Sequence, residues 1–232
     1  MSSRFELIAF DADDTLWHNE IVFQSTHKRF VSLLEKYHEP EWILERLFAT
    51  EIQNLKHFGY GIKGFTLSMI ETAVELTEGR VSGKEIQYIV EMGRDMLAHP
   101  VELLEGAKEV VEEIAGSHPI MLLTKGDLLD QETKLARSGL GDLFSDIEIV
   151  SEKNVDTYAA VLERQKVHPE KFLMVGNSIK SDIIPVLEAG GEAVYIPYKT
   201  TWAHEQVPEK EVKQHQFTRL GSIQELPPWL GG

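Results

Sequence analysis

Short apolar runs alternate along this chain with segments that repeat apolar side chains at helical spacing. The runs have the length of buried β-strands and lie at residues 5–10, 120–123, 147–150, 172–175 and 193–196. Helical periodicity occurs between and after them, at residues 103–115, 127–137, 155–165 and 181–189. Because strands that alternate with helices form parallel sheets, the pattern predicts an α/β fold built on a doubly wound parallel sheet.

One long interval breaks the alternation between the first strand and the second. A connection of this kind normally takes a few residues and one helix, yet about 90 residues separate Thr15 from the next predicted core helix. The interval predicts four helices, at residues 22–37, 41–56, 65–76 and 84–97, with Ser82 and Glu85 at capping-box spacing before the last. We therefore expect a small α-helical domain at residues 18–100, inserted into a core formed by residues 1–17 and 101–232.

The C-terminal tail, residues 227–232, begins with two consecutive prolines. Proline cannot continue the interior of a helix, so we expect this tail to be non-helical. Its large aromatic residue, Trp229, is expected to pack on the core.

Charge narrows the range of partners. Lys and Arg number 23 and Asp and Glu number 38 among the 232 residues, which gives a formal net charge of −15. Nucleic acid and anionic membranes are bound through clustered cations, so we expect neither as a partner. A solvated surface explains most of this charge, and the alternative for some carboxylates is that they converge on a bound cation.

The sequence also indicates a compartment. It contains no cysteine, so it needs no oxidising environment. A strand-like run that begins at Phe5 leaves no room for a cleavable leader, and no apolar run approaches the roughly 20 residues that span a bilayer. We expect a cytoplasmic protein.

Polar residues follow four of the five predicted strands at the point where each strand ends. They are Asp11-Ala12-Asp13-Asp14-Thr15, Thr124-Lys125-Gly126-Asp127, Lys153, and Gly176-Asn177-Ser178 with Asp182 behind it. Each group by itself is typical of turns and helix N-caps. Ligands of parallel sheets bind at the carboxyl ends of the strands, however, so polar groups gathered at this edge favour a functional site.

Asp11 and Asp13 lie two residues apart, a spacing that places both carboxylates on one side of an extended chain. Like charges about 4 Å apart repel by about 4 kcal/mol at an effective dielectric of about 20, so either one carboxyl takes a proton or a cation binds among them. Mg2+ prefers oxygen ligands, and a carboxyl with a raised pKa serves as a general acid and base. The alternative, strongest for Asp14, is a turn with helix-capping aspartates.

Lys153 and Thr124 have ordinary explanations when each is taken alone, as a solvated lysine and a local cap. Opposite an aspartate cluster, the Lys153 ammonium would supply the positive charge that a bound phosphate needs. The Thr124 hydroxyl and the glycine-containing turn after it would donate hydrogen bonds to phosphate oxygens.

The order of these motifs resembles the haloacid dehalogenase (HAD) superfamily. Its four motifs correspond to Asp11-x-Asp13-x-Thr15, Thr124, Lys153 and Gly176-Asn177-Ser178-x3-Asp182, and the resemblance covers the core from Phe5 to about Pro197. It implies a Rossmann-like core and an inserted helical cap that closes over the active site. The chain departs from the family at Asn177, where Asp is frequent, and at Asn154, where Pro is frequent. We expect Asn177 to change metal affinity more than activity, because it can still orient a ligand by hydrogen bonding.

The resemblance also implies roles for individual residues. Asp11 would be the nucleophile that forms an aspartyl phosphate, and Asp13 would be the general acid and base. The family's Mg2+ would be bound by the Asp11 carboxylate, the Asp13 backbone carbonyl and Asp182. Thr124 and Lys153 would hold the phosphoryl oxygens.

The residue at position 13 separates reaction classes. Halide leaves without protonation, and the dehalogenases of this superfamily resemble the pattern without the second aspartate, so Asp13 favours hydrolysis of a phosphate ester. The sequence therefore predicts a Mg2+-dependent phosphatase of small-molecule phosphomonoesters. Two alternatives stay open: a phosphomutase, which also needs an acid and base, and a non-catalytic binding module on the same fold.

Candidate substrate contacts lie beside the first two motifs, beside the fourth and in the insert. Besides Thr124 and Lys153, they are Lys125, Trp17, His18, Asn19 and Asn177. The glycine-rich, basic and aromatic segment from Lys56 to Gly64 is a further candidate, with an ordinary interhelix loop as the alternative. A cap of this size favours a small phosphorylated metabolite over a phosphoprotein, while the physiological substrate and the oligomeric state stay open.

Overall fold

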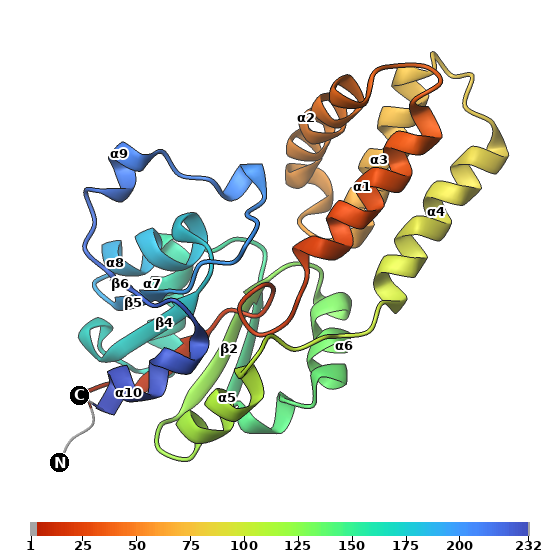
Figure 1. Ribbon diagram of the computed structural model, residues 1–232. Helices are drawn as coiled ribbons and strands as arrows, with labels where there is room; N and C mark the ends of the chain where they lie inside the picture. The colour runs from red at the N-terminus through yellow and green to blue at the C-terminus, as the bar shows by residue number, and fades with distance from the viewer. Residues whose placement is uncertain (1–3, 232) are drawn as a thin grey trace. The chain divides into compact units, whose positions relative to one another are not determined.

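The structure, a computed structural model that describes residues 4–231, contains a six-stranded sheet (Figure 1). Its strands are β1 Leu7–Phe10, β2 Ile120–Lys125, β3 Asp146–Val150, β4 Phe172–Gly176, β5 Glu192–Tyr195 and β6 Thr218–Arg219. Their order is β3-β2-β1-β4-β5-β6, and every neighbouring pair is parallel. The predicted parallel α/β sheet is confirmed, and the apolar pattern misses only the two-residue β6.

Both faces of the sheet are covered, which explains why its strands read as continuous apolar runs. All four residues of β1 are buried. Ile8 joins the apolar cluster that includes α5 (Ala107–Ala115), whereas its neighbour Leu7 joins the cluster on the other face, which includes α7 (Val155–Gln165). Successive side chains of a strand point to opposite faces, so this double burial requires an apolar residue at every position.

The strand order reverses at β1, in the middle of the sheet. The chain runs outward through β2 and β3 on one side of β1, and it then returns to β4, β5 and β6 on the other side. Ligands of such sheets bind outside the carboxyl ends of the strands at this reversal. The ends of β1 and β4 therefore mark the place where a site is expected.

The other helices outside the insert are α6 Leu128–Ser138, α8 Ile184–Glu188, α9 Glu209–Val212 and α10 Leu226–Gly231. The helix predicted at residues 103–115 begins only at Ala107, because Gly106 takes a left-handed φ of 76° that regular helix does not allow. The helix predicted at residues 181–189 is divided into a π-helix, Ile179–Ile183, and α8. Such π-helical turns are frequent at functional sites.

The prediction of a non-helical tail is wrong, because residues Leu226–Gly231 form α10. Pro227 and Pro228 lie in its first turn, where the backbone N–H groups have no partner inside the helix and proline is tolerated. Trp229 packs on the core as expected, with its ring stacked at 6.2 Å from that of Phe5. Gly232 lies outside the described residues.

Contacts between residues divide the chain into two compact units. The first contains Ile21–Pro100 and Gly126–Asp130, and the second contains the segment up to Glu20, Val101–Lys125 and the chain from Gln131 onward. The predicted boundaries at residues 18 and 100 place Gly126–Asp130 in the core. Its contacts instead group it with the helical unit.

The helical unit has a core of its own. It holds α1 Glu20–Leu34, α2 Pro40–Phe58, α3 Ile62–Leu76 and α4 Gly83–Ala98. Phe30, Leu47 and Met69 are buried among these helices. Ser82 and Glu85 form the predicted capping box at the start of α4. Over residues 4–231, no helix has the length and apolar character needed to cross a membrane.

Candidate active site

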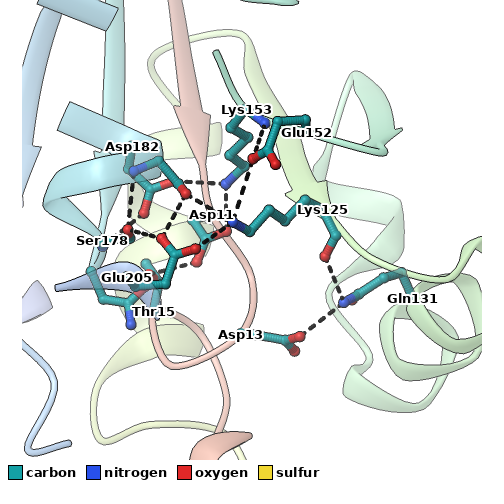
Figure 2. Close-up of polar contacts among 12 residues, drawn as sticks. Asp11, Asp13, Thr15, Lys125, Gln131, Glu152, Lys153, Ser178, Asp182 and Glu205 are labelled. Carbon is teal, nitrogen blue, oxygen red and sulfur yellow. Dashed lines mark hydrogen bonds and ion pairs between the residues drawn. The ribbon is translucent and has the colours of Figure 1, made fainter. Parts of the chain in front are cut away.

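Polar side chains from the ends of several strands lie together at one edge of the sheet (Figure 2). Asp11 follows β1, Lys153 follows β3, and Asp182 lies in the π-helix after β4. All three are buried, as is Thr124 near the end of β2. The edge is the one where the strand order reverses, so the sheet topology accounts for the meeting of residues far apart in sequence.

Lys153 joins the two buried aspartates. Its Nζ donates to Asp11 Oδ1 at 2.5 Å and to Asp182 Oδ1 at 2.7 Å. Burial by itself would lower the pKa of the ammonium, but the two carboxylates outweigh it and raise the pKa of Lys153 to about 12. We call Lys153, Asp11 and Asp182 the Lys153 cluster; when both carboxyls are ionised, they carry one more charge than the single ammonium neutralises.

The environment of the cluster changes the pKa of Asp11, the predicted nucleophile. Burial raises the pKa of its carboxyl to about 7, with Lys153 opposing this rise and Asp182 adding to it. The second oxygen of Asp11 accepts a hydrogen bond from Thr15 Oγ1 at 3.0 Å, and the same hydroxyl lies 3.3 Å from Asn177 Oδ1. Asn177 therefore contacts the first motif through its side-chain oxygen.

Asp182 is held by the turn that precedes it. The backbone N–H of Ser178 donates to Asp182 Oδ2 at 2.9 Å. The carboxylate also lies against the Cα of Gly176, because a Cβ at that position would be only 2.3 Å from Asp182 Oδ2. Glycine in the fourth motif is thus required for the close approach of this carboxylate.

The Lys153 cluster has the donor chemistry of a Mg2+ site. Asp11 and Asp182 offer hard oxygen donors, and their excess negative charge favours a cation. Across the described residues, no group of three or more His, Cys, Asp or Glu side chains is placed to hold a metal. Two carboxylates from the protein, with backbone oxygen, water and substrate oxygens in the other positions, fit the usual habit of Mg2+.

Asp13 lies apart from this cluster, beside Gln131 (Figure 2). Its carboxylate accepts hydrogen bonds from Trp17 Nε1 at 2.7 Å and from Gln131 Nε2 at 2.8 Å. Lys134 Nζ forms an ion pair with it at 3.0 Å. Gln131 and Lys134 both come from α6, so sequence reasoning restricted to strand ends misses them. Their spacing of three residues places them on one helix face, but nothing in the sequence places that face against Asp13.

Asp14 has the capping role that the sequence left open. It takes a left-handed φ of 63°, and its carboxylate accepts the backbone N–H groups of Asn19 and Glu20 at the start of α1. Burial raises the pKa of this carboxyl to about 7. Its carboxylate contacts the backbone of Asn19 and Glu20 and the phenol of Tyr198, so it belongs to the framework of the site.

The structure gives three predicted substrate contacts partners within the protein. Trp17 is only 1% exposed and packs in the apolar core, and its indole N–H donates to Asp13. Lys125 directs its ammonium to Glu205 at 2.5 Å and to Ser181 at 2.9 Å, so a carboxylate already neutralises it. His18 lies beside Tyr198, with 2.6 Å between Nδ1 and the phenol oxygen.

Glu205 is a functional candidate that sequence reasoning missed. It lies in the 3-10 helix Ala203–Glu205, well beyond the end of β5, where no motif marks it. Burial by itself would raise the pKa of its carboxyl, but Lys125 and the hydroxyls of Ser178 and Ser181 lower it to about 2. The one signal in the sequence is that this segment also follows a strand end at the same edge of the sheet.

The predicted segment from Lys56 to Gly64 spans the end of α2 and the start of α3. Within the helical unit, Lys63 Nζ pairs with Asp127 at 2.8 Å. His57 and Phe58 lie ring to ring at 6.3 Å. None of these contacts assigns the segment a ligand.

Comparison with known proteins identifies the family to which this chain belongs. A family model described as haloacid dehalogenase-like hydrolase matches residues 5–190. A haloacid dehalogenase-like family hydrolase from Xanthomonas campestris, known as a crystal structure, is 43% identical, and the match covers 98% of this chain and 91% of that chain with a TM-score of 0.87.

Proteins of two different reaction types are also similar. The pyrimidine 5'-nucleotidase YjjG of Escherichia coli (strain K12) is 27% identical over 172 residues, which are 67% of this chain and 72% of that protein. The L-2-haloacid dehalogenase of Xanthobacter autotrophicus shares the fold at 14% identity, with a TM-score of 0.67 over 98% of this chain and 99% of that chain.

Proposed function

Because the chain belongs to the haloacid dehalogenase-like hydrolase family, we propose that it is a Mg2+-dependent phosphatase of small-molecule phosphomonoesters. The observation that carries the proposal is the Lys153 cluster, in which two buried carboxylates share one ammonium, together with a second aspartate at position 13. The proposed substrate is a small phosphorylated metabolite, and the proposed location is the cytoplasm.

Asp11 is the proposed nucleophile. A bond forms between its carboxylate oxygen and phosphorus while the bond from phosphorus to the ester oxygen breaks, so the site must neutralise an anion that attacks an anion. Lys153 holds Asp11 in one orientation and contributes a positive charge, and Thr15 binds the second oxygen of the carboxylate. Bound Mg2+ adds further neutralisation of the phosphoryl oxygens, and the Asp11 carboxylate, the Asp13 backbone carbonyl and Asp182 would hold it.

Asp13 is the proposed general acid and base. It gives a proton to the departing ester oxygen and then takes one from the water that hydrolyses the aspartyl phosphate. Trp17, Gln131 and Lys134 fix the orientation of its carboxylate. Halide would leave without a proton, so an oriented carboxyl at this position favours a phosphate ester over a haloacid as substrate.

The test is release of inorganic phosphate, with and without Mg2+, from p-nitrophenyl phosphate and a panel that starts with pyrimidine nucleoside monophosphates, as the name of the Escherichia coli relative suggests. We expect Asp11→Asn to lower the rate by about 1,000-fold or more, because a carboxamide is a poor nucleophile. Asp142→Asn, at an exposed aspartate in the 3-10 helix Gly141–Leu143, is the matched control.

Three results would contradict the proposal. Undiminished phosphate release by Asp11→Asn would overturn the mechanism. Halide release from a 2-haloacid, without phosphate release from any ester, would make the chain a dehalogenase. Conversion of a sugar phosphate to its isomer, again without free phosphate, would make it a phosphomutase.

A further inference from the structure

A second polar cluster lies beside the Lys153 cluster and has no part in the mechanism above (Figure 2). Its centre is the carboxylate of Glu205. One oxygen, Oε1, accepts from Lys125 Nζ at 2.5 Å, and the other, Oε2, accepts from the hydroxyls of Ser178 and Ser181. We call these four residues the Glu205 cluster; it links the segment after β5 to the turn after β4.

The hydrogen-bond directions within this cluster are fully determined. Ser178 Oγ accepts the backbone N–H of Ser181 at 3.0 Å, and Ser181 Oγ accepts from Lys125 at 2.9 Å. Each serine hydroxyl therefore has its single proton left for Glu205. Only a carboxylate offers acceptors on both oxygens, because a glutamine would turn its amide N–H groups toward one set of these donors.

The segment that carries Glu205 is fastened to the π-helix at a second point. Lys180 Nζ donates to the backbone carbonyl of His204 at 2.8 Å. On the other side of the same turn, Tyr158 Oη donates to the carbonyl of Ser181 at 2.9 Å. The π-helix at Ile179–Ile183 is thus restrained by contacts from α7 and from the segment after β5.

The restrained turn is the one that presents Asp182. Ser178 binds Glu205 through its hydroxyl and Asp182 through its backbone N–H. The Asp182 backbone N–H in turn donates to the Ser178 carbonyl at 2.8 Å. A shift of Ser178 would therefore move the Asp182 carboxylate relative to Asp11.

We propose that Glu205 is a positioning residue, which holds the turn at Ser178–Asp182 in the conformation that presents the Asp182 carboxylate to Mg2+. The inference rests on the proposed function only in naming Mg2+ as the ion that Asp182 binds. Glu205 itself touches neither substrate nor metal; it acts through the two serines.

The test compares Glu205→Gln with Glu148→Gln. Glu148 lies in the middle of β3 and forms an ion pair with Arg164 at 2.9 Å. It makes no contact with the Glu205 cluster, so its replacement controls for the loss of a glutamate charge. Two readouts need no turnover: hydrogen exchange of the amides of residues 176–184 in the metal-free protein, and calorimetric titration with MgCl2.

We expect Glu205→Gln to speed exchange at Ser178, Ser181 and Asp182 and to weaken Mg2+ binding, each by about tenfold, the equivalent of about 1.4 kcal/mol or one to two hydrogen bonds. Glu148→Gln should leave both quantities within about twofold of the wild type. Wild-type exchange or wild-type Mg2+ affinity in Glu205→Gln would overturn the proposal. So would an equal loss in the control, or a wild-type protein that binds no Mg2+.

A double variant keeps the test decisive if Glu205→Gln fails to fold. Lys125→Met combined with Glu205→Met removes both charges, so no buried charge is left unpaired, and it leaves no side-chain oxygen to accept from the two serine hydroxyls. We expect it to fold and to keep the fast exchange and weak Mg2+ binding, because the serines still lack their acceptor. Recovery of wild-type values would show that Glu205 merely neutralises Lys125, and the proposal would be wrong.

Turnover separates this proposal from the proposed function. A wild-type protein that binds Mg2+ but releases no phosphate would overturn the phosphatase alone, while the exchange and calorimetric results would still decide the role of Glu205. Phosphate release by wild type, with unchanged Mg2+ affinity in Glu205→Gln, would overturn the positioning role alone.

Discussion

Lys125 and Lys153 come from the ends of neighbouring strands, yet their surroundings differ. The Lys153 ammonium is completely buried and shared by Asp11 and Asp182. The Lys125 side chain is 16% exposed and pairs with Glu205, whose side chain is 10% exposed, while the more exposed Glu152 lies 3.6 Å away. The first cluster keeps an excess of buried negative charge close to the proposed nucleophile, whereas solvent screens the excess at the second.

This difference distinguishes the proposed reacting site from the proposed supporting cluster. A lysine after a strand at the ligand edge is a candidate for phosphate binding in either position. What decides its role is the number and burial of the carboxylates that reach it, because these set the charge left for a substrate or a cation. Under the proposals for these two clusters, the same residue type serves catalysis in one cluster and helps to hold a turn in place in the other.

The largest expected effect comes from replacing each lysine in turn. Lys153→Met should lower phosphate release with saturating Mg2+ by about 1,000-fold, because a buried cation of this kind is worth about 3–5 kcal/mol to its partners. Lys125→Met should cost less than about tenfold, since its partners lie outside the reacting atoms. The measurement is steady-state turnover of p-nitrophenyl phosphate, with thermal unfolding to verify that both variants are folded.

Equal losses in the two variants would break the comparison, because they would place both ammonium groups in the same functional class. A larger loss in Lys125→Met would reverse it and restore Lys125 as a direct substrate contact.

A smaller effect tests the excess charge of the Lys153 cluster. Mg2+ at ten times its dissociation constant should stabilise the wild type by about 1.4 kcal/mol, because it binds only the folded state. Asp182→Asn removes one of the two carboxylates, and we expect the stabilisation to vanish. Urea unfolding with and without MgCl2 measures it, with CaCl2 and NaCl at equal ionic strength as controls; an undiminished gain in Asp182→Asn would place the cation elsewhere.

The smallest effect concerns the Glu205 cluster and pH. The pKa of Glu205 is lowered to about 2 in the folded protein, below the ordinary value of 4.5. Its contribution to stability is therefore complete above pH 4.5 and is lost as the pH falls toward 2. Between about pH 4.5 and 3.5, the wild type should lose about 1 kcal/mol more of its unfolding free energy than Glu205→Gln, as measured by urea unfolding. Parallel curves for the two proteins would contradict the assigned pairing.

Much of the fold could be predicted from the sequence because its signals are local. The apolar runs that become β1 to β5 need only their own residues to be recognised, and the capping box at Ser82 and Glu85 is equally local. The misjudged helix start at Ala107 and the helical tail fail for a related reason: Gly106 and the prolines at 227 and 228 act through backbone conformations that the apolar pattern does not report.

The residues of the candidate site also differ in whether local sequence signals predict them. Asp11, Lys153 and Asp182 could be predicted, since the rule about strand ends needs only strand positions. Gln131 and Lys134 could not be assigned to Asp13, because α6 had to be placed against the first motif before their helix face had a meaning. Trp17 looked available beside the motif, and only packing revealed that it is buried.

By itself, the sequence of this protein determined a parallel α/β core with a helical insert and the set of residues gathered at one edge of the sheet. The tertiary structure alone decided how charge is shared among them: Lys153 between two aspartates, and Lys125 with Glu205 from a segment that no motif marks. Hydrophobic periodicity is a local property that can be read directly from the sequence. The pairing of buried charges depends on distances that exist only after the chain has folded.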